Sequence, residues 1–222
     1  MSIPLLKSQS AKLRPNALLR VLLGDLEFSI ISNNCWGAHV YQILGLPYRT
    51  PFVGLFIPPK SYIHLLRNFA ECIYSELVFI QNSKLDRFNS WRERERLSYP
   101  IGLLGNEVEI HFLHYGSDEE ARSKWRRRCT RLIDDPKRCY FKFDDRDGAV
   151  AEDFEAFDRM SIPNKVCFSA SKLNVPTVVV PGEPGARQAL DGVSLARVSR
   201  HYFNTLRWLS TRPAWLPLPS LM

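Results

Sequence analysis

Polar and reactive side chains gather in three short stretches whose residue types could do chemistry. The first, Asn33-Asn34-Cys35-Trp36-Gly37, lies where an apolar run gives way to a helical pattern. Backbone N–H groups at a helix N-terminus attract anions and lower the pKa of a nearby thiol. Cys35 is therefore a candidate nucleophile, and Asn33, Asn34 and Trp36 are candidates to line the reacting group. The alternative is a turn in which the asparagines cap the helix and Cys35 is buried.

Two histidines mark the second stretch, IHFLHY. His111 and His114 are three residues apart, and on a strand this odd spacing places them on opposite faces, which argues against a shared metal ion. His114 is a candidate general acid or base because imidazole titrates near neutral pH, although a structural role is the alternative. Tyr115 is a candidate substrate contact. His111 is expected to support the site or to form hydrogen bonds in the core.

The third stretch, Asp144-Asp145-Arg146-Asp147-Gly148, places carboxylates and a guanidinium in one tight loop. Asp145 or Asp147 could orient His114 or bind sugar hydroxyls, and Arg146 could contact a substrate. The spacing is not that of an EF-hand, and no metal ligand set is predicted, but a divalent cation is not excluded. The alternative is a polar turn that caps the following helix.

Basic residues dominate one predicted helix, over 117–133. Arg127 and Arg128 on this helix could hold a phosphate of an activated donor, or they could form a solvated face. The formal net charge of +7 favours acidic partners. No nucleic-acid-binding motif is present, so sequence-specific nucleic-acid binding is not expected.

Strands alternating with helices predict a three-layer α/β fold, Rossmann-like, with a mostly parallel sheet and helices on both faces. One domain, 1–222, is expected, with a core over about 25–210, an N-terminal helix over 9–24 and an extended C-terminal tail. The predicted strands are 27–32, 77–81, 101–104, 108–114, 138–143, 166–169 and 177–180. The other predicted helices are 38–44, 60–75, 150–159 and 195–210. Ligands bind at the carboxyl ends of parallel strands, so the three stretches are expected to meet at one edge of the sheet.

Four further segments complete the prediction. Segment 51–57 is a short strand or an extended loop, and Gly105-Asn106 could form a hairpin turn. The charged segment 83–99 is interpreted as an exposed excursion with a helical turn. Segment 181–192, rich in Gly and Pro, is expected to be a mobile loop.

Common signatures and targeting segments are absent from the sequence. No GxGxxG, P-loop, GxSxG or HExxH motif is present. Five cysteines without a CxxC pair favour free thiols in a reducing compartment. No apolar run is long enough for a transmembrane helix, and no signal peptide is recognised, so a cytoplasmic protein is expected. The basic helix over 9–24 could touch a membrane surface.

Several long motifs, in order, carry a family resemblance. ISNNCWGAHVYQILGLPYRTPFVGLFI, YPIGLLGNEVEIHFLHYGSDEEARSKWRRR, KFDDRDG and NKVCFSAS resemble a bacterial domain of unknown function found in exopolysaccharide and capsule biosynthesis clusters. The resemblance runs from about Phe28 to Ser169 and reappears near 200–209. Asn106 departs from the aspartate of the family pattern. A fainter similarity is to SGNH-type esterases, which implies an SGNH-like alternative for the fold, although their C-terminal DxxH block is missing.

The resemblance implies a link to surface-polysaccharide assembly. The leading hypothesis is a cytoplasmic transferase that modifies a sugar by acyl or glycosyl transfer, with a saccharide or nucleotide-sugar substrate and an activated sugar or acyl donor. The alternative is a non-catalytic carbohydrate-binding or scaffold protein of the assembly machinery. Peripheral contact with membrane-bound polysaccharide machinery at the inner membrane face is a further expectation.

Overall fold

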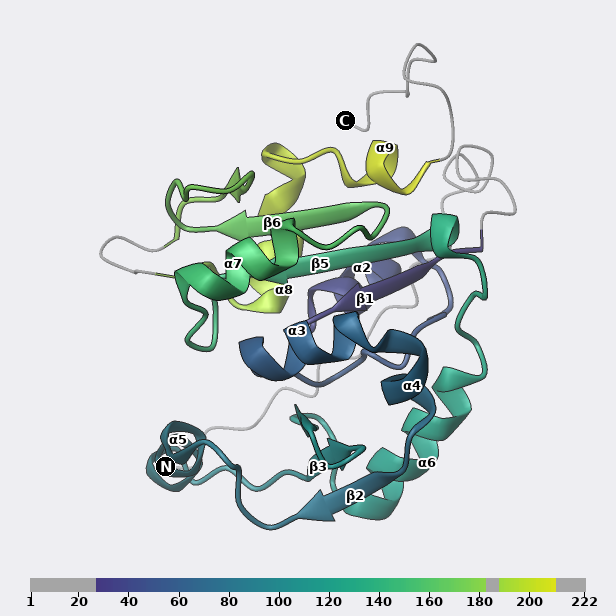
Figure 1. Cartoon of the computed structure of the whole chain (residues 1–222), viewed down its shortest axis with the longest axis vertical. Helices are drawn as coiled ribbons and strands as arrows, with labels where there is room; N and C mark the ends of the chain where they lie inside the picture. The colour runs from purple at the N-terminus through teal and green to yellow at the C-terminus, as the bar shows by residue number, and fades with distance from the viewer. Residues whose placement is uncertain (1–26, 183–187, 211–222) are drawn as a thin grey trace, which may run out of the picture.

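The computed structural model describes residues 27–182 and 188–210. The predicted helix over 9–24 and the predicted C-terminal tail lie outside these residues, as does part of the predicted loop over 181–192. Figure 1 shows the described chain with its strands and helices labelled.

A four-stranded parallel sheet forms the centre of the fold. Its strands are β1 (Ser29–Ser32), β5 (Cys139–Asp144), β6 (Lys165–Ser169) and β7 (Val178–Val179), in the order β1-β5-β6-β7. Every pairing in this sheet is parallel, which confirms the mostly parallel sheet predicted from the sequence. β1 and β5 are buried along their whole length because helices cover both faces of the sheet.

Helices on the two faces of this sheet complete a three-layer arrangement. Helices α2 (Trp36–Leu44) and α8 (Gly192–Val198) pack against each other on one face, and α3 (Pro59–Arg67) and α7 (Ala151–Asp158) contact each other on the opposite face (Figure 1). Successive strand residues point to opposite faces. Accordingly, Ile30 packs in the core on the α2 side, whereas Ile31 packs in the core that contains α3 and α7 residues.

A second sheet corrects one prediction. Strands β2 (Leu77–Ile80), β3 (Ile101–Leu104) and β4 (Val108–His111) form a separate antiparallel sheet, in the order β2-β3-β4. Segment 108–114 was expected to end at the edge of the parallel sheet, and that expectation is wrong. Gly105 and Asn106 both adopt positive φ, of 55° and 64°, and make the tight turn that pairs β4 with β3.

The remaining helices differ in length from the prediction, and α5 (Asp86–Arg94) is a nine-residue helix where a helical turn was expected. The structure also has α4 (Phe69–Tyr74), α6 (Asp118–Cys129) and α9 (Thr205–Leu209), with 3₁₀ helices at Pro136–Arg138 and Ser199–His201. The predicted helix over 60–75 breaks at Asn68, where φ is −122° and ψ is 39°. The predicted helix over 195–210 is divided into three pieces, the last of which begins at the Asn204 cap.

Segment 49–57 runs along the outer edge of β1. The Thr50 hydroxyl donates to the carbonyl of Ile30 (2.7 Å), and the Ile57 N–H donates to the carbonyl of Asn33 (2.8 Å). The segment was predicted to be a strand or an extended loop, and its one β-bridge joins Phe56 to His111. It therefore connects the edge of the parallel sheet to the antiparallel sheet.

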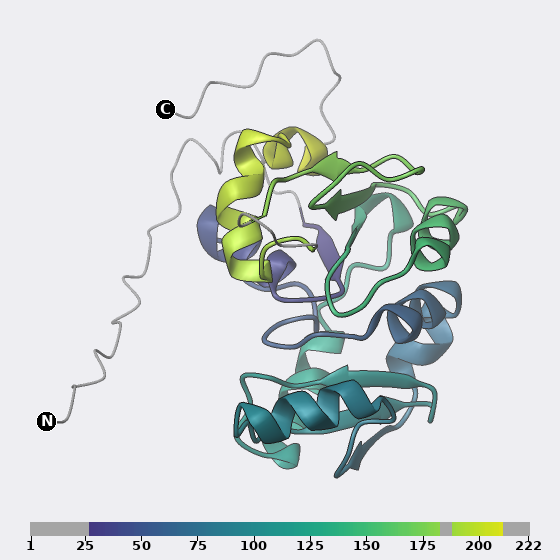
Figure 2. The same cartoon turned by 90° about the vertical axis from the view of Figure 1, so that its left-hand side faces the viewer.

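A single hydrophobic cluster includes residues of both sheets. It contains Ile31 and Phe143 of the parallel sheet together with Leu104 and Ile110 of the antiparallel sheet. Tyr62 of α3 lies between them, with its hydroxyl within hydrogen-bond distance of the Ile31 carbonyl (2.8 Å). Figure 2, which looks onto the carboxyl ends of the parallel strands, shows α5 below that edge. No helix of the described residues has both the length and the apolar character needed to cross a bilayer.

Candidate functional site

A sealed polar network lies where β1 and β5 end. Lys142 and Asp144 form an ion pair with no exposed surface. The Lys142 ammonium also donates to Asn33 Oδ1 (3.1 Å) and Asn34 Oδ1 (3.0 Å), and the two asparagine amides donate to the Asp144 carboxylate (2.9 and 2.8 Å). Both the oxygen and the nitrogen of each asparagine amide are thus bound within the network. Asn33 and Asn34, predicted to bind substrate, therefore hold the two strand ends together in this structure.

The charges of this pair are kept by their mutual contact. Burial acts to raise the pKa of Asp144, but the Lys142 ammonium and the asparagine amides outweigh burial and hold that pKa below its usual range. Burial lowers the pKa of Lys142, an effect that the Asp144 carboxylate opposes. Each charge thus depends on the other for its stability in the interior.

Cys35 and Trp36 follow β1 but do not face open space. Cys35 Sγ lies 3.6 Å from the carbonyl oxygen of Leu55, and burial raises the pKa of the thiol, which is opposite to the lowering expected from the helix N-terminus. Trp36 is fully buried, with its ring 5.5 Å from that of Phe168, and its Nε1 donates to Ser199 Oγ (3.3 Å). Trp36 therefore belongs to the core on the α2 side of the sheet.

We expect the thiols of the native chain to react slowly with iodoacetamide. All five cysteines are free and buried, and burial raises the pKa of each, for Cys129 to about 12. Only the thiolate attacks the reagent. Mass spectrometry should find less than one label per chain under conditions in which the denatured chain takes up five. Rapid labelling of Cys35 alone in the native protein would contradict this and would revive its role as a nucleophile.

Asp145 and Arg146 tie the loop after β5 to neighbouring segments. The Asp145 carboxylate accepts hydrogen bonds from the backbone N–H groups of Ala170 (2.7 Å) and Ala189. Arg146 Nη1 donates to the carbonyl of Ala189 (2.9 Å). Burial raises the pKa of Asp145, which these backbone donors oppose. Both side chains thus fix the segment that leads into α8.

Asp147 differs from its neighbours because its carboxylate makes no hydrogen bond or ion pair with the described residues. Its backbone has a positive φ of 60°, and its side chain is half-buried. Burial, together with the negative charge of Asp144, raises the pKa of Asp147 to about 6, although Arg146, Lys142 and Arg87 act in the opposite direction. A carboxylate of this kind can exchange a proton near neutral pH.

His114 and Tyr115 both form hydrogen bonds with segment 53–55. His114 is exposed, and its backbone N–H donates to the carbonyl of Gly54 (3.1 Å). The buried Tyr115 hydroxyl donates to the carbonyl of Val53 and accepts a hydrogen bond from Arg128. No hydrogen bond or ion pair within the described chain joins His114 to Cys35 or Asp145. The structure thus brings Asp145 and Cys35 to one edge, as predicted, and places His114 in the turn after β4, against Gly54 of the segment that contacts Cys35.

The two predicted phosphate contacts on α6 have different surroundings. Arg128 is tied to Tyr115 and lies with its guanidinium carbon 5.7 Å from the ring centre of Tyr48. Arg127 is exposed, and its guanidinium makes no hydrogen bond or ion pair with any described residue. Arg128 is thus occupied by protein groups, whereas Arg127 belongs to a solvated face.

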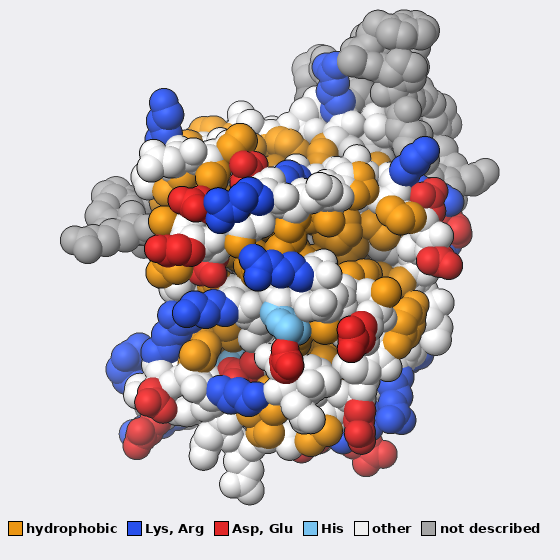
Figure 3. Space-filling model, in the orientation of Figure 1, with side chains coloured by type: hydrophobic (Ala, Val, Ile, Leu, Met, Phe, Trp, Pro, Cys, Tyr) orange, Lys and Arg blue, Asp and Glu red, His pale blue; other side chains and the backbone are white. Residues whose placement is uncertain are grey.

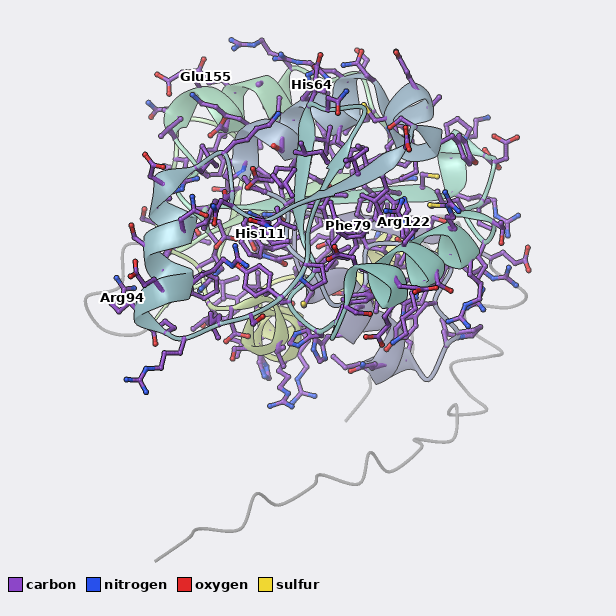
Figure 4. All side chains as sticks on the ribbon, turned by 90° about the horizontal axis from the view of Figure 1, so that it is seen from below. His64, Phe79, Arg94, His111, Arg122 and Glu155 are labelled. Atoms are coloured by element: carbon purple, nitrogen blue, oxygen red, sulfur yellow. The ribbon has the colours of Figure 1, made fainter. Side chains whose placement is uncertain are left out.

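A buried hydrogen-bonded chain surrounds His111. His111 Nε2 lies 2.6 Å from Glu109 Oε1, and His111 Nδ1 lies 3.1 Å from the Tyr99 hydroxyl. Glu109 also accepts hydrogen bonds from the Ser83 hydroxyl and from the Lys84 backbone N–H (2.8 Å). Figure 4 shows His111 in the interior, beside α5. His111 thus forms hydrogen bonds within the core, one of the two roles expected from the sequence.

Glu109 and Tyr99 were not among the residues singled out from the sequence. Glu109 was identifiable, because residues two apart on a strand share a face, and Glu109 and His111 are the polar pair of β4. Tyr99 carried no such signal, since it lies outside the regular elements. Glu109 could thus be found from the strand pattern, whereas Tyr99 is identified as a partner only by the folded structure.

The buried histidine predicts a pH dependence of stability. Burial lowers the pKa of His111, an effect that Glu109 opposes, so the unfolded chain binds a proton at this position more readily than the folded protein does. The stability that neutral His111 contributes is therefore fully present above pH 6.5, the pKa of histidine in the unfolded chain. It falls as the pH drops below that value. The free energy of unfolding, measured by urea titration at pH 7.5 and 5.5, should fall more in the wild type than in His111→Gln.

The comparison with His111→Gln is needed because other groups titrate in the same range. Asp147, whose pKa is raised, changes the free energy of unfolding in the opposite direction. The stability that its protonated form contributes is present at low pH and is lost as the pH rises through about 6. His39, whose pKa burial lowers, contributes in the same direction as His111. Equal pH slopes in the wild type and in His111→Gln would refute the assignment to His111.

A separate apolar groove of about 310 Å³ lies between α7 and β6. Phe154, Phe157, Cys167 and Phe203 are among its lining residues, and none of the residues singled out from the sequence lines it. Figure 3, which views the face covered by α3 and α7, shows hydrophobic side chains at the surface there. The described residues contain no cluster of three or more His, Cys, Asp and Glu side chains that could hold a metal ion.

Two comparisons with known proteins place the chain in a family. An uncharacterized protein of Haemophilus influenzae is 34% identical over 154 residues, which cover 69% of this chain and 67% of that protein. Residues 7–190 match the family described as "Domain of unknown function (DUF1919)". The matched region contains all three stretches singled out from the sequence. The chain therefore belongs to the DUF1919 family.

Proposed function

We propose that this protein is a transferase that modifies a sugar unit during the synthesis of a bacterial exopolysaccharide or capsule. The observation that carries the proposal is Asp147, a half-buried carboxylate without a hydrogen bond to the described residues and with a pKa raised to about 6. It lies in the loop that follows β5, three residues after the end of the strand at Asp144, at the edge where α/β proteins bind ligands. The resemblance of the sequence motifs to an exopolysaccharide-associated domain supports a sugar as the substrate.

The chemistry of this site is proton transfer coupled to group transfer. The ionised Asp147 carboxylate takes the proton of an acceptor hydroxyl as the oxygen attacks the donor. The new bond forms to the carbonyl carbon of an acyl donor or to the anomeric carbon of a sugar donor. The bond from that carbon to the leaving group breaks, and the leaving group departs with the bonding electrons. Arg146, whose charge acts on Asp147, offsets negative charge in the site.

The proposed function also implies where in the cell the reaction takes place. Activated sugar and acyl donors are made inside the cell, and the free thiols of this chain suit a reducing compartment. We therefore place the reaction in the cytoplasm, with peripheral contact to membrane-bound polysaccharide machinery.

A non-catalytic role in binding saccharide is the second candidate. It is favoured by the degree to which Asn33, Asn34, Cys35 and Asp145 are occupied by contacts within the protein. Among the described residues of this edge, few side chains besides Asp147 remain without a partner in the protein. Such a protein would bind a saccharide or a protein partner of the assembly machinery without turnover.

The experiment that separates the two candidates uses the purified full-length chain. It is incubated with nucleotide sugars or acyl-coenzyme A donors together with saccharide acceptors, and products are sought by mass spectrometry. Transfer of a sugar or acyl group to the acceptor is the expected result. Saturable binding of saccharide with no turnover of any donor would overturn the transferase proposal in favour of the binding role.

A further inference from the structure

Arg87, at the start of α5, lies directly on the bare face of Gly148. An added Cβ atom at Gly148 would be 1.9 Å from Arg87 Nη1 and 2.7 Å from Arg87 Cζ. The guanidinium therefore fills space that any other side chain at position 148 would occupy. Gly148 also has a positive φ of 80°, which glycine adopts without strain. This contact joins α5 to the loop after β5, next to Asp147.

The guanidinium of Arg87 makes no hydrogen bond or ion pair with any described residue. Arg87 Cζ lies 4.7 Å from the centre of the Phe88 ring. Other arginines around the two sheets donate to backbone carbonyls: Arg92 to Gln81 and Arg122 to Leu77. Arg87 is an exposed residue whose guanidinium lies against Gly148 and keeps N–H donors that no described residue uses.

The charged groups around Arg87 favour a negatively charged ligand, because more cations than carboxylates act on the neighbouring Asp147. The Arg87 guanidinium lies against Gly148 of the loop after β5, and the ring of the next residue, Phe88, is 4.9 Å from the ring of His111 on β4. Arg87, Arg146 and Lys142 all act electrostatically on Asp147. A planar guanidinium binds phosphate oxygens through two parallel hydrogen bonds, and an ammonium cannot reproduce that geometry.

We propose that Arg87 binds the pyrophosphate group of an activated donor and that Gly148 provides the space for its guanidinium. This inference rests on the proposed function, because that function identifies the ligand as a donor. The inference adds that the donor is a pyrophosphate diester. Both nucleoside diphosphate sugars and coenzyme A thioesters carry that group. Bound in this way, the donor lies beside the carboxylate that takes the proton from the acceptor.

Isothermal titration with UDP-glucose and with coenzyme A, in separate arms, tests the proposal. The wild type should bind one of the two probes, and Arg87→Gln should weaken that binding about 10- to 100-fold. Arg87→Lys should restore only part of the loss. Arg94→Gln is the matched control, because Arg94 lies on the same helix, is highly exposed and points away from the body of the protein (Figure 4). The arm that shows binding identifies the source of the pyrophosphate.

Gly148→Ala tests the second half of the proposal. The methyl group must displace the guanidinium, so affinity for the same probe should fall as in Arg87→Gln. Thermal unfolding checks that the variant is folded, and Arg87→Gln, an exposed substitution, carries the test if it is not. Unchanged affinity in Arg87→Gln, or no binding of either probe by the wild type, would overturn the proposal. Binding that depends on Arg87, without any turnover, would leave this subsite standing and refute the transferase.

Discussion

Replacing Lys142 with methionine should lower the free energy of unfolding by about 3–5 kcal/mol. Methionine matches the length of the lysine stem but leaves the Asp144 carboxylate buried without a cation. Both side chains have no exposed surface, so water cannot replace the lost partner. The amides of Asn33 and Asn34 still donate to the carboxylate, but their own oxygens lose the ammonium donor. Urea unfolding followed by circular dichroism measures the difference.

The double variant Lys142→Met, Asp144→Asn is the control for this result. It removes both charges, so no uncompensated charge remains in the interior, and part of the stability lost in Lys142→Met should return. A loss below about 0.5 kcal/mol in the single variant, which is typical of surface substitutions, would contradict the buried pair.

Replacing Asp147 with asparagine should lower the rate of transfer about 10²- to 10⁴-fold, the usual contribution of a general base. Asparagine has the same shape but cannot accept the proton of the acceptor hydroxyl. In the wild type, the rate should rise with pH through about 6, because only the ionised carboxylate is a base. The pH profile of Asp147→Asn should lack this inflection. Both profiles are measured with the donor and acceptor that the turnover screen identifies.

Asp145→Asn is the matched control, because Asp145 lies in the same loop. Its carboxylate accepts backbone hydrogen bonds from Ala170 and Ala189, so the substitution should lower stability and leave the inflection near pH 6 in place. If Asp147→Asn keeps that inflection, or keeps the wild-type rate, the role of Asp147 as the base is refuted.

The parallel sheet could be predicted from the sequence because its strands are short apolar runs that end at polar loops. Strands β1 and β5 begin and end within two residues of their predicted bounds, and their loops lie side by side as expected. The strand over 108–114 was assigned to the wrong sheet, although Gly105-Asn106 was identified as a hairpin turn. A local sequence pattern is enough to predict the turn. Which sheet the hairpin belongs to depends on packing between residues far apart in the sequence.

The candidate site could be predicted only in part, for a similar reason. Residue type and position beside a strand identified Asp147, but they did not separate it from Asp145, whose backbone partners come from distant segments. Arg87 lies in a highly charged segment, and such segments usually form solvated faces. Its contact with Gly148 joins residues that are far apart in the sequence, which no local pattern can show.

The protection of the outer side of β1 restricts how copies of this chain could associate. Thr50 and Ile57 already occupy carbonyls along that side, so an incoming strand from another molecule would find few groups with which to form a ladder. Within the described residues, the opposite border of the same sheet is β7, which is two residues long. A continuous sheet formed by joining the parallel sheets of two molecules is therefore disfavoured.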